Sequence, residues 1–266
     1  MNEFRDVSIL MGAVTETDSL RETVLTVLKL CDHADLREII ICYSQHATPE
    51  CLAVISELES MDCDVPIVGL RQKRPGLSGF MDMFEIARGS HCIFGASDLA
   101  LDLTCTPVMI EYAKQDPECI VTISRWLKGC RFYHYGAIKK IMNYCGQIFL
   151  RLLYSVDLTD MTTPYQIVPT ELYRSIAFEH EDFPFMLEMV LKPLRLGYRF
   201  LEIPSNCYGR KEGKSSNSFR QTAGFLPVAI HIRFMKKEKI LKPDSALYAR
   251  FFGVSATSSE KDVMKE

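Results

Sequence analysis

The feature that most constrains the fold is a regular alternation of short apolar runs with helical patterns through the first half of the chain. Runs of four to six residues predict strands covered on both faces, because such strands need no polar side. Helical patterns lie between them, near residues 49–60, 77–88 and 106–114. The alternation predicts a doubly wound, mostly parallel sheet in a single α/β domain. The runs expected to form strands are Val7–Met11, Ile39–Cys42, Val65–Leu70, His91–Phe94 and Cys119–Ile123.

Polar segments follow the predicted strands, at the places where a sheet of this kind binds its ligands. In doubly wound sheets the ligand lies beyond the carboxyl ends of the parallel strands. We therefore expect the segments after the strands to surround one crevice. These segments are Gly12–Glu16, Tyr43–His46, Gly95–Asp102 and Ser124–Arg131.

The charge of the chain is divided unevenly between its two halves. Residues 1–118 carry 9 basic and 20 acidic side chains, a balance of −11, whereas residues 119–266 carry 22 basic and 14 acidic ones, a balance of +8. Residues 119–156 contain six cations and no carboxylate. A basic half indicates a polyanionic partner such as a phosphate or an anionic membrane. We expect no nucleic-acid partner, because no recognisable nucleic-acid-binding module accompanies the charge.

The cysteines and the apolar runs indicate the cellular location of the protein. Its 10 cysteines are scattered without C-x-x-C pairs, which is typical of reduced thiols in a cytoplasmic protein. No apolar run reaches the roughly 18–20 residues that a membrane-spanning helix requires. We therefore expect a cytoplasmic protein, with any membrane contact made peripherally at the inner face.

Two apolar helical stretches mark the second half of the chain. From Ala137 to Val156 apolar residues recur at helical spacing, with lysines and arginines beside them. A second stretch, 218–239, is rich in Phe, Ile and cations. A basic amphipathic helix can lie in a membrane interface, but a core-facing helix shows the same stripe, and both interpretations stay open. We place the domain at residues 1–240 and expect a partly disordered tail at 241–266.

Three polar segments could carry chemistry at the crevice. Asp98, with Ser97 beside it, directly follows a predicted strand, where a carboxylate can hold Mg²⁺ or Mn²⁺ against a diphosphate. The loop 209–215 holds three cations, among them Arg210, and two glycines, which suits closure over a phosphate-bearing substrate. The cations of Arg71-Gln-Lys-Arg74 precede a predicted helix, whose N-terminus would suit a diphosphate. Charged surface loops are also commonplace, so the residues alone leave that interpretation open.

The sequence resembles family 2 glycosyltransferases, and within them the dolichyl- and polyprenyl-phosphate mannose synthase group. Gly197-Tyr-Arg-Phe-Leu-Glu-Ile-Pro204, with Arg210 and Ser215 in the following loop, is similar to the family's G-Y-R-x-x-E-(V/I)-P … R-x-x-G-x-S segment. Val7–Glu16 is similar to the family's opening V-S-V-V-I-P-A-Y-N-E. Ser124-Arg125-Trp126 together with Arg131 corresponds to the family's G-S-R-Y … R. The likeness covers roughly residues 5–220.

The nucleotide-facing motifs depart from the family pattern. The family has Asp-x-Asp-Leu where this chain has Ala96-Ser-Asp98-Leu99, so the second Asp is retained and the first is missing. The family's Asp-Asp-Gly-Ser after the second strand is here Tyr43-Ser-Gln-His46. The acid that reads the base in the family is therefore absent, and Tyr43 could stack on a base in its place.

The resemblance implies a single GT-A-like α/β domain, with a mixed, mostly parallel central sheet flanked by helices. It implies transfer of a sugar, with inversion, from a nucleotide-diphosphate donor to a polyprenyl-phosphate-type acceptor. It implies that Asp98 binds Mg²⁺ or Mn²⁺ and acts in catalysis with Arg125, Arg131 and Arg210. The donor nucleotide would contact Glu16, Tyr43, Ser97 and Asp98, and the acceptor phosphate would contact Arg125, Arg131, Arg210 and Ser215.

Two alternatives remain from the sequence. One is a family member that uses a soluble saccharide acceptor. The other is a non-catalytic domain of the same fold that binds a nucleotide sugar or a partner, which the changes at Ala96 and Tyr43 favour, because altered residues at a binding site usually cost activity.

Overall fold

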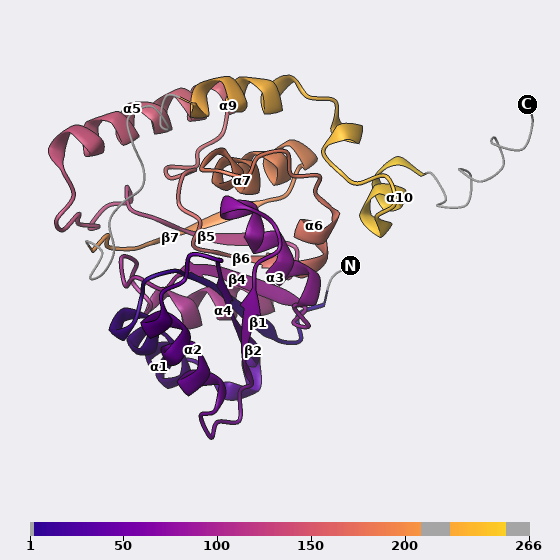
Figure 1. Ribbon diagram of the computed structural model, residues 1–266. Coiled ribbons are helices and arrows are strands. Elements are labelled where there is room, and N and C mark those ends of the chain that lie inside the picture. The colour runs from indigo at the N-terminus through magenta and orange to yellow at the C-terminus, as the bar shows by residue number, and fades with distance from the viewer. Residues whose placement is uncertain (1–2, 209–223, 254–266) are drawn as a thin grey trace, which may run out of the picture.

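A seven-stranded sheet forms the centre of the part of the chain that the computed structural model describes, residues 3–208 and 224–253 (Figure 1). The strand order is β3-β2-β1-β4-β6-β5-β7. All neighbouring strands are parallel except that β6 runs antiparallel to both β4 and β5. The mixed, mostly parallel sheet predicted from the sequence is confirmed. The strands are β1 Val7–Ala13, β2 Leu36–Tyr43, β3 Ile67–Arg71, β4 His91–Ala96, β5 Ile120–Ser124, β6 Gln166–Pro169 and β7 Phe200–Pro204.

Helices cover both faces of this sheet, because alternate side chains of each buried strand point to opposite faces. On one face Ile9 and Ile39 pack with α1, α2 and α4, and on the other Leu10 and Ile40 pack with α3, α6 and α7. Short 3-10 helices lie at His33–Asp35 (η1), Gly76–Gly79 (η2) and Lys237–Lys239 (η3). The α-helices are α1 Asp18–Leu30, α2 Pro49–Glu59, α3 Phe80–Ile86, α4 Cys105–Gln115, α5 Ala137–Tyr154, α6 Thr170–Ser175, α7 Pro184–Leu196, α9 Phe225–Phe234 and α10 Ala246–Phe252.

Helices α5 and α9 form a further layer outside α7, at the top of Figure 1. Leu150 of α5, Leu191 of α7 and Ile232 of α9 pack together in a core of their own. The helix expected from Ala137 onward is confirmed as α5, whereas the second stretch is described only from residue 224. Within the region set aside as a tail, α10 packs on α6 and buries Leu247.

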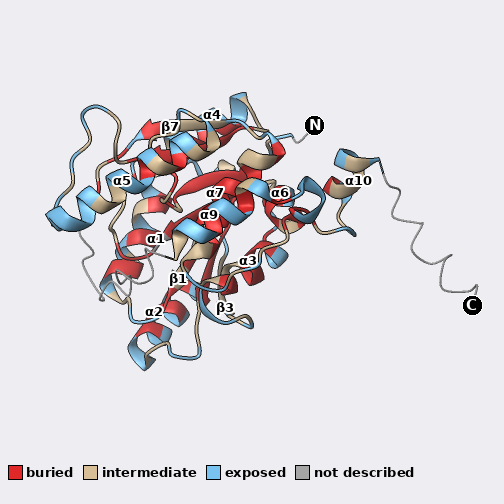
Figure 2. Ribbon diagram, turned by 90° about the horizontal axis from the view of Figure 1, so that it is seen from above, coloured by how far each residue is buried: buried red, intermediate tan, exposed pale blue. Residues whose placement is uncertain are grey.

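Helix α5 turns only part of its apolar stripe toward the core. Of its 18 residues only Gln147 and Leu150 are buried, and the helix is largely exposed or intermediate in Figure 2. Phe149 and Leu153 pack beside Leu150 in the core shared with α7 and α9. Ile138 is 76% exposed, Ile141 64% and Leu152 76%. The interpretation of the stripe as a core-facing surface therefore holds for one part of it, and the other part faces outward.

Helix α7 carries a buried ion pair that holds the loop between α6 and α7. Glu188 and Lys192 are both fully buried, with 3.4 Å between Nζ and Oε1. Lys192 also donates to the carbonyl of Ala177, and Glu188 accepts from the backbone N–H of Glu179 at 2.9 Å. The carbonyl of Glu181, in the same loop, accepts from the first N–H groups of η2. The buried pair thus fixes a loop that lies against the segment after β3.

We expect Lys192→Met to lower the free energy of unfolding by about 3–5 kcal/mol, because it leaves the Glu188 carboxylate buried without its cation. Urea unfolding followed by circular dichroism measures the change. The double variant Lys192→Met/Glu188→Leu should recover part of the loss, since it removes both charges. A single variant as stable as the wild type would contradict this account of the pair.

Candidate active site

The carboxyl ends of the strands bring the residues expected to bind the donor to one edge of the sheet. In the strand register Ala13 lies opposite Tyr43, and Tyr43 lies opposite Arg71. Ser97, directly after β4, donates from its hydroxyl to the carbonyl of Gly12 in β1 at 2.6 Å. This bond ties the ends of β1 and β4 together. The Ser97 hydroxyl is therefore engaged in joining two strands and is almost fully buried.

Glu16 closes the loop that follows β1. Its Oε2 accepts from the backbone N–H groups of Val14 at 2.7 Å and Thr15 at 3.0 Å. The carbonyl of Val14 accepts from the N–H of Thr48, which joins this loop to the one after β2. One carboxylate oxygen of Glu16 thus shapes the crevice wall on the side where Tyr43 ends its strand.

Asp98 lies at the carboxyl end of β4 and is only 5% exposed. Its Oδ1 accepts from the N–H of Ala100 at 3.0 Å, and Leu99 between them has a left-handed backbone, with φ +56°. A left-handed residue other than glycine is uncommon and marks a turn that its surroundings hold in place. The carbonyl of Ala100 in turn accepts from the N–H of Tyr208 at 2.9 Å.

The segment Asn206–Tyr208 joins the Asp98 loop to Arg131. The N–H of Cys207 donates to the carbonyl of Arg131 at 2.9 Å, and the N–H of Arg131 donates to Oδ1 of Asn206 at 2.9 Å. The side chain of Arg131 itself is exposed. The loop of Asp98, through Ala100, and the backbone of Arg131 are thus both hydrogen-bonded to the segment Asn206–Tyr208. Arg210 and Ser215 follow that segment but lie outside the described residues.

Arg125 is held in a buried ion pair that the resemblance to the family did not predict. Its Nε and Nη2 donate to the two carboxylate oxygens of Asp160 at 2.6 and 2.9 Å, and Nη2 also donates to Thr162. The Arg125 side chain is 11% exposed and that of Asp160 is fully buried. Burial alone would lower the pKa of the Arg125 guanidinium, but the charge of Asp160 outweighs it and raises that pKa. Arg125 therefore stays charged, with two of its nitrogens committed to Asp160.

Asp160 is fixed from β7 as well. Glu202 accepts from two backbone N–H groups, that of Thr159 through Oε2 and that of Asp160 through Oε1, and each distance is 2.8 Å. Burial raises the pKa of Glu202, whereas these N–H donors act to lower it. The glutamate of the 197–204 segment thus holds the loop that carries the partner of Arg125.

The same cluster extends to α5. Gln147 donates from Nε2 to Thr162 at 2.8 Å and to Asp160 at 3.2 Å, and its Oε1 accepts from the N–H of Met161. Asn143 accepts from the indole N–H of Trp126 at 3.0 Å and donates to Thr162 at 3.1 Å. We call Arg125, Asp160, Thr162, Gln147 and Asn143 the polar cluster.

The cations after β3 precede the helix N-terminus at which the sequence suggests a diphosphate site. Arg74 pairs with Asp82 and Glu85, and the N–H groups of Lys73 and Arg74 donate to Asp82. The N–H groups that begin η2 donate to the carbonyl of Glu181. The helix N-terminus and Arg74 therefore already have partners within the protein, and Arg71 and Lys73 are the exposed cations of this segment.

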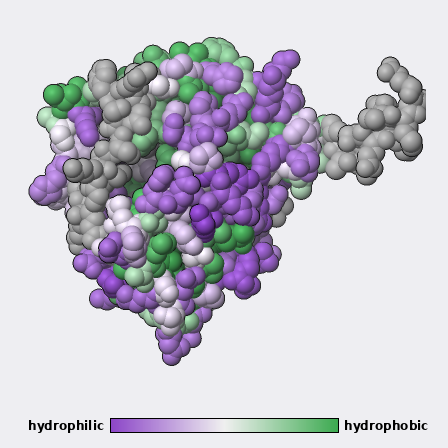
Figure 3. All heavy atoms as spheres, in the orientation of Figure 1, coloured by the Kyte–Doolittle hydropathy of each residue, from purple (hydrophilic) through white to green (hydrophobic). Residues whose placement is uncertain are grey.

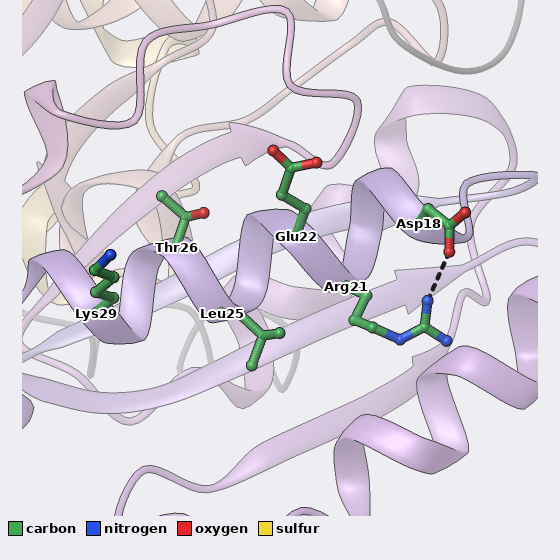
Figure 4. A pocket seen from close by; sticks show the side chains of 6 residues that line it. All are labelled: Asp18, Arg21, Glu22, Leu25, Thr26 and Lys29. Carbon is green, nitrogen blue, oxygen red and sulfur yellow. Dashed lines mark hydrogen bonds and ion pairs between the residues drawn. The ribbon is translucent and has the colours of Figure 1, made fainter.

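Surface hollows do not mark the crevice. A shallow hollow of about 290 Å³ lies along α1 and is lined by side chains of that one helix, as Figure 4 shows. Arg21 in it pairs with Asp18 at 2.8 Å and with Glu57 of α2 at 2.7 Å. These ion pairs join the partly exposed side chains of α1 and α2, and we assign them no part in chemistry.

Asp98 offers one carboxylate to a divalent ion at this edge. Among the described residues there is no group of three or more His, Cys, Asp and Glu side chains that could hold a metal. Mg²⁺ is commonly held by one or two carboxylates together with substrate phosphates. Asp98 therefore fits an ion that arrives with a diphosphate, and not a preformed metal site.

Several residues that build the site carried no sequence signal for their role. No pattern in the sequence pairs Arg125 with Asp160. Asn143 and Gln147 are four positions apart, which puts them on the same side of a helix and opposite its apolar stripe, and this placement was the one available signal.

A parallel sheet with one antiparallel strand, and a carboxylate and arginines gathered at its carboxyl edge, define a GT-A-like α/β domain. Comparison with known families matches residues 8–191 to glycosyl transferase family 2. The chain belongs to glycosyltransferase family 2. The resemblance stated from the motifs is confirmed.

Two curated relatives align over part of their length. The undecaprenyl-phosphate mannosyltransferase of Micrococcus luteus is 28% identical over 102 residues, which are 37% of this chain and 42% of that protein. The glycosyltransferase AglD of Haloferax volcanii is 24% identical over 210 residues, which are 75% of this chain and 32% of that protein. The chain thus matches less than half the length of either relative.

Among solved structures, glucosyl-3-phosphoglycerate synthase from Mycobacterium tuberculosis has the same fold. Its complex with Mn²⁺, uridine diphosphate and phosphoglyceric acid superposes with a TM-score of 0.65 at 12% identity, covering 87% of this chain and 80% of that one. Another complex of the same enzyme holds Mg²⁺ and uridine diphosphate. At this identity the likeness shows the GT-A-like fold alone.

We expect Asp160→Asn to lower the free energy of unfolding by about 3–5 kcal/mol, because Arg125 would keep its charge in a buried place without a counterion. Asp157→Asn is the matched control. Its exposed carboxylate lies 3.7 Å from Arg151, and surface changes of this kind usually stay within about 0.5 kcal/mol. Chemical denaturation of both variants measures the difference. Equal stability of the two would show that the buried pair contributes nothing.

Proposed function

We propose that this protein transfers a sugar, with inversion, from a nucleotide-diphosphate donor to a polyprenyl-phosphate-type acceptor. The observation that carries the proposal is the junction at the carboxyl edge of the sheet. There residues 206–208 are hydrogen-bonded both to the loop of Asp98 and to the backbone of Arg131. The loop proposed to bind the donor and the loop proposed to bind the acceptor are thereby joined through their backbones, which supports a shared site. Family membership and the partial match to an undecaprenyl-phosphate mannosyltransferase support the same assignment.

In this proposal the chemistry depends on positioning and on charge. The acceptor phosphate is already ionised, so its oxygen can attack the anomeric carbon without a strong general base, while the nucleoside diphosphate departs from the opposite side. A divalent ion bound at Asp98 would neutralise charge on the departing diphosphate. Glu16 and Tyr43 would contact the nucleoside, with Tyr43 stacking on the base.

The arginines would divide the work on the acceptor side. Arg131 has a fixed backbone and an exposed side chain, so it can reach a phosphate directly. Arg125 contributes its charge from within its pair with Asp160 and keeps the loop after β5 in place. Arg210 and Ser215 would complete the phosphate site from the loop that follows Tyr208.

A phosphate acceptor that is not lipid-linked is the second candidate. The solved neighbour binds phosphoglyceric acid together with uridine diphosphate, and its fold is that of this chain. A soluble saccharide acceptor remains within the same class of reaction. The non-catalytic alternative is supported by Ala96 and Tyr43, where family acids are replaced.

The polyprenyl-phosphate proposal also implies a place of action. A polyprenyl phosphate resides in a bilayer, so the protein would work from the cytoplasm at the inner face of a membrane, as a peripheral protein. Among the described residues no helix is long and apolar enough to cross a membrane. The contact with lipid would therefore be made from the surface.

We expect Asp98→Ala to lower kcat/KM for transfer by about 10²–10³-fold, the usual effect of losing one stabilising group at a developing charge. The measurement is transfer of a labelled sugar from UDP- and GDP-sugars to undecaprenyl phosphate, with and without Mn²⁺. Asp102→Ala, which removes a carboxylate that caps Thr104 in the same loop, is the matched control and should retain most activity. Wild-type transfer by Asp98→Ala would refute the assignment. Absence of transfer by the wild-type protein to any acceptor, with UDP still raising its melting temperature, would favour the non-catalytic alternative.

We expect Arg131→Ala to weaken acceptor binding by about 1.5–3 kcal/mol, the range for hydrogen bonds to charged groups. The change should raise KM for the phosphate acceptor and leave KM for the nucleotide sugar nearly constant. Lys128→Ala removes an exposed cation three positions away and serves as the control. An equal effect of the two variants would show that general positive charge, and not a contact by Arg131, binds the acceptor.

A further inference from the structure

Helix α5 has an outer face that no other part of the described structure, residues 3–208 and 224–253, covers. None of its first ten residues, 137–146, is buried. Its exposed apolar side chains include Ile138, Ile141 and Leu152, and Ile148 among them is 41% exposed. A soluble helix usually places such residues against the core, so a face of this kind indicates a partner surface.

Helix α9 extends the same face. Its Phe234 is 75% exposed, and Leu226 and Ile230 are exposed beside it. The two helices are joined by hydrogen bonds from Tyr154 to the carbonyl of Ala229, at 2.8 Å, and from Arg233 to the carbonyl of Leu153, at 2.8 Å. Figure 3 shows hydrophobic side chains gathered along the upper edge of the molecule, where Figure 1 places α5 and α9.

The charges around this face select its partner. Helix α5 carries three exposed cations, Lys139, Lys140 and Arg151, and no carboxylate. Three further lysines follow α9 and are exposed, at Lys236, Lys237 and Lys239, with Glu238 the acid among them. An apolar face bordered by cations is complementary to an anionic lipid surface, where the apolar side chains enter the acyl boundary and the cations meet headgroups.

The inner face of α5 contacts the candidate active site. Gln147 is 2% exposed and donates to Asp160, the counterion of Arg125. Asn143 holds Trp126, which directly follows Arg125 in the chain. The first three turns of α5 have no buried apolar residue of their own. They are attached to the body of the protein at the crevice by these polar contacts and by the contact of the Tyr144 ring with Trp126, with 5.1 Å between ring centroids.

We propose that α5 is a lipid-responsive element whose docking on an anionic membrane sets the position of the polar cluster. The outer face of α5 binds lipid, and this binding shifts the helix. Asn143 and Gln147 act as positioning residues, because their hydrogen bonds make Trp126, Asp160 and Arg125 follow the helix. The inference rests on the proposed transfer reaction for its catalytic consequence, but not for the structural coupling itself.

Trp126 makes the coupling measurable without any activity, because it is the only tryptophan in the chain. Its indole N–H bonds to Asn143, so its fluorescence reports the contact between α5 and the crevice. Vesicles of phosphatidylglycerol should shift the emission of Trp126 in the full-length protein. Vesicles of phosphatidylcholine should not, and added salt should reverse the shift by screening the charges.

Two pairs of variants separate docking from coupling. Ile141→Glu on the outer face should abolish vesicle binding in co-sedimentation, whereas Leu25→Glu, at an exposed apolar position on α1, should not. Asn143→Leu should keep vesicle binding but lose the Trp126 shift. Asn143→Asp retains an oxygen that accepts from the indole and should restore the shift.

Transfer to a short, water-soluble prenyl phosphate gives the catalytic readout, since this acceptor needs no membrane for delivery. Anionic vesicles should raise kcat of the wild type at least about fivefold, the lower end of usual couplings between sites, and should not raise that of Asn143→Leu. Vesicle binding with an unchanged Trp126 emission and unchanged kcat would overturn the coupling, and absence of vesicle binding would overturn the docking surface. A Trp126 shift without transfer under any condition would uphold the coupling and refute the proposed reaction.

Discussion

The buried pair of Arg125 and Asp160 is the interaction on which the acceptor side of this protein depends. A buried ion pair contributes stability only when its remaining donors and acceptors are also satisfied. Here they are satisfied by Thr162, by Gln147 and by the backbone N–H of Arg125 itself. The loop after β5, the start of β6 and α5 must therefore be in place together. Such a cluster favours one arrangement of three chain segments over others of similar compactness.

The antiparallel strand β6 makes this arrangement possible. Because it runs against its neighbours, its first residue, Gln166, lies at the edge where β4 and β5 end. The segment 159–165 therefore arrives at the crevice, although it precedes a strand and does not follow one. Glu202, on the neighbouring strand of β5, then fixes Thr159 and Asp160 by their backbone N–H groups. The rule that ligands lie beyond the carboxyl ends of parallel strands therefore does not predict the segment that supplies Asp160, the counterion of Arg125.

The sequence predicted the parts of the fold that depend on local pattern. Apolar runs such as Ile39–Cys42 became buried parallel strands, because burial on both faces leaves a local signature. The pairing of Arg125 with Asp160, across 35 positions, and that of Arg74 with Asp82 and Glu85 leave no such signature. Cations before a helix were read as a phosphate site, whereas the helix N–H groups had an acceptor in Glu181, which is remote in sequence. Motif resemblance placed Asp98 and Arg131 at one edge, but their common link through residues 206–208 is a tertiary feature.

Helix α5 shows why periodicity could not decide which face of a helix is buried. Its apolar residues recur regularly, and a core-facing helix would look the same. What distinguishes the two cases is the opposite face, where Asn143 and Gln147 meet partners from the chain ends of β5 and β6. Two amides on an inner face are stabilising only because Trp126, Thr162 and Asp160 satisfy them. The helix is therefore oriented by its polar contacts, and the exposure of Ile138 and Ile141 is the consequence. A chain that satisfies buried amides in this way leaves part of its apolar stripe for another surface to cover.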